Sequence, residues 1–166
     1  MKLKYSLIII FLSLFFSISK AQHRAVGPYN TGIGLRAGFL YGLTLKHFLN
    51  THVALEGLGG TRWQGYTIIG LFEYQSETHF SEDIDWFVGF GGHAGNYERK
   101  YFLENGGALH YTGNVYAVGI DAIVGLEYKV NHVPLTIGID FKPFFDLVNS
   151  NHNYLDAGLT ARFVFK

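Results

Sequence analysis

The sequence of 166 residues contains no cysteine, three prolines and little charge. Without cysteine the chain has neither a disulfide framework nor thiol chemistry. Charged residues make up 16% of the sequence, against about 25% in an ordinary soluble domain. The formal net charge is +0, so the total charge gives no argument for nucleic acid as a partner. Aromatic residues reach 17% and glycines number 21, which is unlike a typical cytosolic protein.

The chain has no apolar run long enough for a transmembrane helix. Two lysines near the start precede an apolar core from Leu7 to Ile18, and small residues follow at positions 19–21. A spanning helix needs about 20 apolar residues, and this core is shorter. The arrangement instead predicts a cleaved signal peptide over residues 1–21. No cysteine lies at the cleavage site, which argues against a lipoprotein anchor, and residues 22–30 form a short lead-in.

Most of the remaining chain alternates between apolar residues and glycine or charge. The clearest stretch is a predicted hairpin from Val115 to Phe141, whose polar face carries the carboxylates Asp121, Glu127 and Asp140. A period of two is typical of β-strands, because successive side chains point to opposite faces. Similar stretches recur along the chain without a helical period. Their number and spacing predict an all-β, antiparallel up-and-down barrel of about eight strands over residues 31–166.

Alternation alone does not orient the sheet. A soluble barrel turns its apolar faces inward, whereas a membrane barrel turns them toward lipid and keeps a polar lumen. The export signal, the large apolar residues on nearly every strand and the mixture of glycine with charges of both signs favour a transmembrane barrel. The charges predicted to face the lumen are Arg36, Lys46, Glu56, Glu73, Asp85, Asp121, Glu127, Asp140 and Arg162, with Lys142 as a further candidate.

We interpret these charges as a network that fills the lumen. An eight-stranded barrel is just wide enough for side chains to fill, and aqueous channels belong to much larger barrels. Glycine beside long charged side chains suits so narrow a space. The expected partners of Asp121, Glu127 and Asp140 are the basic residues Arg36, Lys46 and Arg162. This reading requires no catalytic role for the carboxylates.

Aromatic residues gather toward the predicted strand ends, as in an interfacial girdle. They are Tyr41, Tyr74, Trp86, Tyr116, Tyr128 and Phe165. Two long connections, over residues 93–113 and 142–153, fall on the extracellular side if the N-terminus is periplasmic. The first contains candidates for contact with a surface ligand, namely Tyr97, Arg99, Lys100, Tyr101, Phe102 and Tyr111. Loops on a rigid scaffold often bind ligands, although these residues could also simply extend the flanking strands.

The strand pattern and the aromatic-rich last strand, Ala157 to Phe165, carry a family resemblance. They resemble the small eight-stranded outer-membrane β-barrels of Gram-negative bacteria, the OmpX-like and OmpA-transmembrane-domain-like group. The resemblance covers residues 31–166 and implies a place in outer-membrane lipid. It also implies that the barrel-assembly machinery reads the last strand. That family usually ends on the aromatic residue itself, whereas here Lys166 follows Phe165.

Residues suited to chemistry are few. Residues 79–81 place His79 two positions before Ser81, with Glu77 and Glu82 nearby, and outer-membrane lipid A deacylases use a similar His-x-Ser pair. We place this pair in a periplasmic connection. Other histidines are scattered without metal-ligand spacing, and no cofactor or metal is predicted. These are His47, His52, His93, His110, His132 and His152.

The sequence therefore predicts a non-enzymatic outer-membrane barrel with a structural or surface-interaction role. Two alternatives stay open. In one, the chain is a secreted, soluble, lipocalin-like barrel whose inward apolar faces bind an apolar ligand. In the other, it is a lipid A-modifying hydrolase that uses His79 and Ser81.

Overall fold

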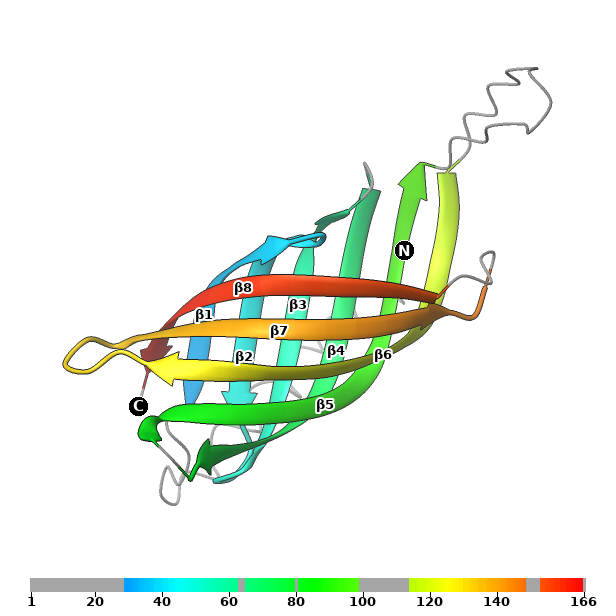
Figure 1. Cartoon of the computed structure of the whole chain (residues 1–166). Helices are drawn as coiled ribbons and strands as arrows, with labels where there is room; N and C mark the ends of the chain where they lie inside the picture. The colour runs from blue at the N-terminus through cyan, green and yellow to red at the C-terminus, as the bar shows by residue number, and fades with distance from the viewer. Residues whose placement is uncertain (1–28, 63–64, 80, 99–113, 149–152, 166) are drawn as a thin grey trace, which may run out of the picture.

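The computed structural model describes residues 29–62, 65–79, 81–98, 114–148 and 153–165. These residues form one antiparallel sheet that closes into an eight-stranded barrel (Figure 1). Its strands are β1 (Thr31–Gly38), β2 (Tyr41–Phe48), β3 (Val53–Arg62), β4 (Gly65–Thr78), β5 (Ser81–Glu98), β6 (Asn114–Lys129), β7 (Leu135–Asp146) and β8 (Asn153–Phe165). The predicted fold class is confirmed. The predicted signal peptide and residues 22–28 of the lead-in lie outside the described residues.

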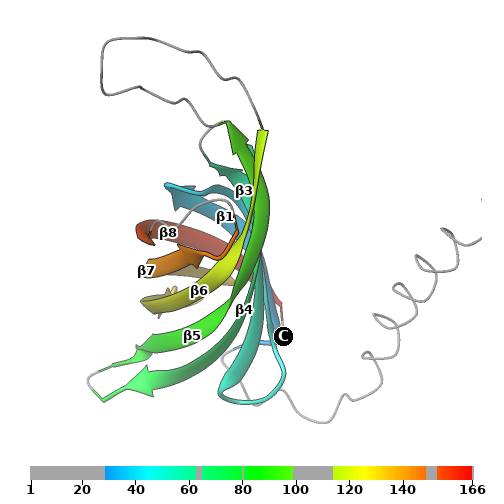
Figure 2. The same ribbon diagram turned by 90° about the vertical axis from the view of Figure 1, so that its right-hand side faces the viewer.

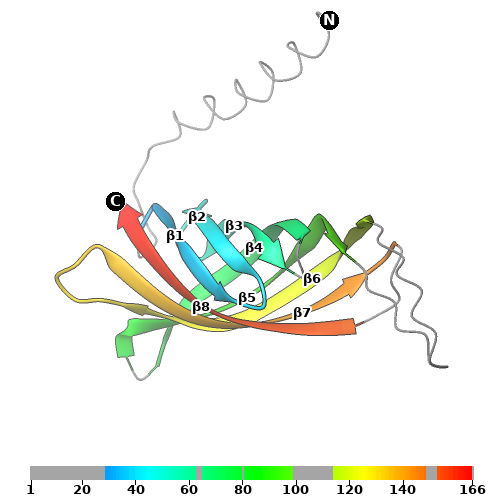
Figure 3. The same ribbon diagram turned by 90° about the horizontal axis from the view of Figure 1, so that it is seen from above.

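Each strand pairs with the next in sequence, and β1 pairs with β8 to close the barrel. Figure 2 and Figure 3 show β1 beside β8, and their register runs from Thr31 opposite Phe165 to Gly38 opposite Gly158. Closure leaves the sheet without a free edge along this seam. Within the part of the chain that the structure describes, no helix is both long and apolar enough to cross a membrane.

Several predicted connections are strand instead. Strand β3 also continues through the glycine pair at 59 and 60 to Arg62. The predicted loop 93–113 begins inside β5, which continues to Glu98. Predicted loop 142–153 likewise contains the end of β7, which continues to Asp146. In each case pairing with a neighbouring strand extends the wall past the end of the clearest hydrophobic alternation, because sheet context overrides local residue preference.

The barrel has two ends, which we name by what lies there. The termini end holds Thr31 and Phe165 and the turns that join β2 to β3, β4 to β5 and β6 to β7. The opposite, loop end holds the turn from β1 to β2 and the last residues of β3, β5 and β7. The wall is uneven in height, because β1 and β2 have 8 residues each while β5 and β6 have 18 and 16. The barrel is therefore tallest at β5 and β6 and lowest at the β1–β2 hairpin.

Apolar side chains cover the outside of the wall. Ile68 is 73% exposed and Phe90 is 68% exposed, while their inward neighbours Ile69 and Glu73 are buried. From the level of Trp86 toward the loop end, no outward-facing side chain that the structure describes is Asp, Glu, Lys or Arg. The structure therefore does not favour the lipocalin-like alternative, which requires the apolar faces to point inward. The charges face inward instead.

Candidate functional site in the barrel lumen

All nine residues predicted to face the lumen are buried inside the barrel. They are Arg36, Lys46, Glu56, Glu73, Asp85, Asp121, Glu127, Asp140 and Arg162, each at most 4% exposed. The charges form two clusters, one toward each end of the barrel. A layer of apolar side chains lies between them.

Arg162 of β8 is the centre of the termini-end cluster. One guanidinium nitrogen donates to Glu127 Oε2 at 2.6 Å, and another donates to Glu56. The third nitrogen, Nε, donates to Thr44 Oγ1 at 3.1 Å. Arg162 therefore joins four strands, because its three partners lie on β2, β3 and β6.

Further side chains complete this cluster around Arg162. The Lys46 ammonium lies 2.7 Å from Glu73 and 4.4 Å from the centroid of the Phe87 ring. Gln75 Nε2 donates to Asp85 at 2.9 Å and to Glu127 at 3.2 Å. Cation and carboxylate are thus paired where no bulk water can solvate either of them.

Tyr29 closes the lumen at the termini end. Its hydroxyl donates to Glu127 Oε1 at 2.9 Å, and its ring meets Phe48 edge-on with centroids 5.0 Å apart. Tyr29 belongs to the last part of the predicted lead-in, yet it is only 1% exposed. The end of the lead-in is therefore part of the lumen packing. Lys129, 3.2 Å from Asp85, lies at the same end.

An apolar layer separates the two clusters. It consists of Leu40, Leu58, Ile69, Leu71, Phe87 and Ile123. The order of residues along the strands puts this layer between the two clusters. On β3, Leu58 lies between Glu56 and Arg62. On β6, Ile123 likewise lies between Asp121 and Glu127. The side chains of this layer contain no group that could coordinate an ion or water.

Arg36 and two aspartates begin the loop-end cluster. The Arg36 guanidinium donates two hydrogen bonds, of 2.6 and 3.2 Å, to the Asp140 carboxylate. It also donates to Asp156 at 3.1 Å and to the backbone carbonyl of Leu40 at 2.9 Å. Such two-pronged arginine–carboxylate contacts fix geometry as well as charge.

His93 lies between two carboxylates of this cluster. Its Nδ1 is 2.7 Å from Asp121 and its Nε2 is 2.9 Å from Asp146. A ring nitrogen that carries a hydrogen can donate it to the carboxylate beside it. Lys142 completes the cluster, 3.0 Å from Asp121 and 3.6 Å from Asp156.

Aromatic stacking covers the loop-end cluster. The Arg62 guanidinium lies 4.1 Å from the centroid of the Phe144 ring, and this ring meets His93 edge-on at 5.5 Å. The Lys142 ammonium lies 5.0 Å from the same ring. Phe144 thus contacts two cationic side chains, Arg62 and Lys142, together with the ring of His93.

Glycines on the inner wall make room for large side chains. A Cβ added at Gly158 would lie 2.5 Å from Cζ of Arg36, so the guanidinium packs flat on the β8 backbone. A Cβ at Gly119 would lie 2.5 Å from Cε1 of His93. Glycine beside a long inward side chain is thus a feature of the lumen, because a narrow barrel has no space for both side chains.

The partners of the central carboxylates differ in part from those expected. Asp140 pairs with Arg36 and Glu127 with Arg162. Asp121, however, pairs with Lys142 and His93, while Lys46 pairs with Glu73.

Sequence reasoning missed much of the loop-end cluster. Its missed members are Arg62, His93, Asp146 and Asp156, together with Tyr29, Thr44, Gln75 and Lys129 toward the termini end. The strand alternation could have revealed some of these residues, because inward side chains on one strand are either all even-numbered or all odd-numbered. Lys142 and Asp146 are even positions that follow Asp140 on β7, and Asp156 has the parity of Arg162 on β8.

The predicted girdle residues all lie on the outside. Tyr74, Trp86, Tyr128 and Phe165 are near the termini end, where the rings of Tyr74 and Trp86 are 5.7 Å apart. Tyr116 lies toward the loop end, and Tyr41 lies at the tip of the β1–β2 hairpin. Of the predicted loop candidates, Tyr97 is part of β5. The others, Arg99, Lys100, Tyr101, Phe102 and Tyr111, lie outside the described residues.

The His-x-Ser pair lies at the termini end, where the turn leads from β4 to β5. His79 is exposed in the turn. The Ser81 hydroxyl accepts a hydrogen bond of 3.3 Å from the backbone N–H of Asp83. Among the described residues, no group of three or more side chains is arranged to hold a metal ion.

The chain shares its fold with a solved barrel, Neisserial surface protein A, known from a crystal structure. The TM-score is 0.54 at 10% sequence identity, and the match covers 81% of this chain and 93% of that one. Both chains are small closed β-barrels. No protein-family model matches the sequence, and no curated protein resembles it closely enough to be a relative. At this identity the likeness concerns the fold alone.

Proposed function

We propose that this protein is a non-enzymatic outer-membrane barrel with a sealed lumen, exported by a signal peptide over residues 1–21. The observation that carries the proposal is the arrangement of charge. The outside of the wall is apolar, while charged side chains are buried in pairs on the inside. In lipid every backbone group must be paired within the protein, which a closed barrel achieves. The likeness to Neisserial surface protein A supports the same placement.

The packing of the lumen supports a structural role rather than transport. Ion pairs occupy both halves of the barrel, and the apolar layer around Phe87 and Ile123 separates them. Each half pairs its cations and carboxylates with one another, so few charged groups remain to receive a solute or act on a substrate. On this proposal the residues exposed at the loop end mediate any surface interaction, and the last strand is recognised during barrel assembly.

Single cysteines on neighbouring residues of β6 test the orientation. The natural chain contains no cysteine, so Val124→Cys and Ile123→Cys each introduce one thiol. Val124 is 51% exposed on the outside, and Ile123 is 3% exposed in the lumen layer. A membrane-partitioning maleimide should label V124C in isolated outer membranes and leave I123C unlabelled. After unfolding in denaturant, both thiols should react.

Two further results decide the proposal. The folded protein should migrate differently from the boiled protein on a gel, and reconstituted barrels should show no ion conductance in planar bilayers. Recovery in the soluble periplasmic fraction would overturn the membrane placement. A steady conductance of the wild-type barrel would overturn the sealed lumen. Changed lipid A mass spectra on expression, abolished by Ser81→Ala, would overturn the non-enzymatic role.

A further inference from the structure

The β1–β2 hairpin ends below the top of the apolar wall. Strand β8 begins at Asn153, but β1 accompanies it only from Gly158 onward. The five residues of β8 beyond that point (158 − 153 = 5) extend about 17 Å along the strand. This extension still carries an outward apolar residue, Leu155, which is 61% exposed. The wall beside the hairpin tip is therefore still apolar above the level of the tip.

The hairpin tip is built for apolar surroundings. It has the sequence Gly-Phe-Leu-Tyr-Gly over residues 38–42, without a charged or amide side chain. Leu40 points inward and is 1% exposed, and its carbonyl accepts a hydrogen bond from Arg36 inside the barrel. Phe39 and Tyr41 point outward. A turn that meets hydrocarbon needs its backbone groups satisfied by the protein, and Arg36 does this for the most inward carbonyl.

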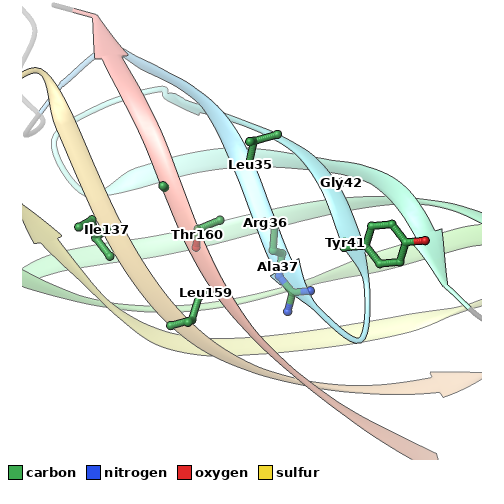
Figure 4. Close-up of a pocket in the computed structure, with 9 residues that line it drawn as sticks. Leu35, Arg36, Ala37, Tyr41, Gly42, Ile137, Leu159 and Thr160 are labelled. Atoms are coloured by element: carbon green, nitrogen blue, oxygen red, sulfur yellow. The ribbon is translucent and has the colours of Figure 1, made fainter.

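An apolar groove of about 510 Å³ lies on the outer wall beside this tip (Figure 4). Its floor is formed by two small outward residues, Ala37 on β1 and Ala161 on β8. Larger side chains form its sides, namely Leu35, Tyr41, Ile137 and Leu159. The groove crosses four adjacent strands, from β7 through β8 and β1 to β2. It exists because alanine replaces the leucine, isoleucine and phenylalanine usual on this wall.

We propose that this groove binds one acyl chain of a membrane phospholipid. The inference rests on the membrane placement proposed above. The volume is in the range of small-molecule pockets, roughly 300–1,000 Å³. Association within lipid depends on van der Waals packing rather than on the hydrophobic effect. A chain lying on Ala37 and Ala161 contacts protein below and on both sides, whereas elsewhere on the wall it contacts protein on one side.

A second copy of the barrel fits this surface less well. A stable protein interface buries about 800 Å² on each partner. Leu35 and Tyr41 form sides of the groove, and they are 65% and 62% exposed. Such protruding side chains would hold a broad β-barrel wall away from the alanine floor. A single flexible hydrocarbon chain can reach the floor between them.

Native mass spectrometry of the intact, folded barrel with palmitoyl-oleoyl phosphatidylethanolamine tests the site. The wild type should retain one lipid at activation energies that remove detergent. The double variant Ala37→Leu/Ala161→Leu fills the groove and should reduce retention by roughly tenfold, equivalent to about 1.4 kcal/mol. The matched control is Ala94→Leu/Ala122→Leu, which adds the same atoms to outward positions on β5 and β6 and should retain lipid like the wild type.

The outcomes separate the site from the membrane placement. Equal retention by both double variants, with heat-modifiable migration intact, overturns the site and leaves the membrane barrel standing. A wild-type dimer that A37L/A161L converts to a monomer overturns the acyl chain in favour of a second copy. Recovery of the wild type as a water-soluble protein overturns both inferences.

Discussion

The two charge clusters of the lumen both pair buried cations with carboxylates, but they use different side chains. Toward the termini end, three glutamates surround Arg162 and Lys46. Toward the loop end, four aspartates surround Arg36, Lys142 and His93. Both clusters fill a narrow space with paired charges, but they differ in how many cations contact the carboxylates. Arg162 alone joins most of its cluster, whereas the loop-end cluster has several cations that share carboxylates.

This difference predicts which substitution lowers the free energy of unfolding of the barrel most. Both arginines bridge two carboxylates. If Arg36 is lost, Asp140 loses its cation, but Asp156 keeps Lys142 at 3.6 Å. Arg162 has no comparable substitute beside Glu127, whose other hydrogen bonds come from the neutral Tyr29 and Gln75. An unpaired buried charge is costly, because no water compensates for the lost partner.

The largest expected effect is that of Arg162→Met. It leaves Glu56 and Glu127 buried without their cation and should destabilise the barrel by about 3–5 kcal/mol. Arg36→Met is the matched substitution in the other cluster and should cost less. The free energy of unfolding is measured by reversible urea denaturation in lipid vesicles. Equal losses for the two variants would contradict the proposed difference between the clusters.

A smaller effect is expected at His93, which pairs with Asp146. His93→Phe removes both ring nitrogens and should cost about 1–3 kcal/mol, because Asp146 then loses its hydrogen-bond partner and has a buried, unsatisfied oxygen. His93→Phe/Asp146→Leu removes both partners, and it should recover most of that loss, since an apolar pair can replace a buried ion pair. The same unfolding measurement gives both values. A double variant less stable than His93→Phe would show that Asp146 contributes through another contact.

The smallest effects compare an inner glycine with an outer one. Gly158→Ala forces the Arg36 guanidinium away from β8 and should cost about 1–3 kcal/mol, as overpacking does. Gly59→Ala points its methyl outward, where nothing lies within 4 Å, and should change stability by less than about 0.5 kcal/mol. Thermal unfolding of both variants in detergent provides the comparison. A loss at Gly59 as large as that at Gly158 would show that strand geometry, not the side-chain space, requires these glycines.

The termini-end charges were predictable because their strands alternate clearly. Glu56 and Glu127 each occupy a polar position among regular apolar ones, so parity alone predicted that they face the same side, whereas the strand of Glu73 alternates least clearly. The fold class followed from the same pattern, since eight such stretches with short connections suit a meander that closes on itself.

The loop-end cluster was not predictable to the same degree. Lys142 and Asp146 lie on either side of Pro143 and two phenylalanines, where the sequence resembles the beginning of a loop. Strand β7 continues through them because β8 pairs with it as far as Phe145 opposite Asn153. His93 follows two glycines on β5, and pairing with β4 and β6 keeps that segment extended. These pairings join distant parts of the chain, so local sequence does not reveal them.

The sequence by itself determined the period of two, and with it which side chains share a face. It also determined the sorting of charge and glycine onto one face of each strand, because that sorting is a property of residue order. Only the tertiary structure decided which carboxylate meets which cation. Register and barrel closure set those distances, and they bring together residues as far apart as Arg36 and Asp156. They also create the acyl-chain groove, which exists only because β1 and β8 lie side by side.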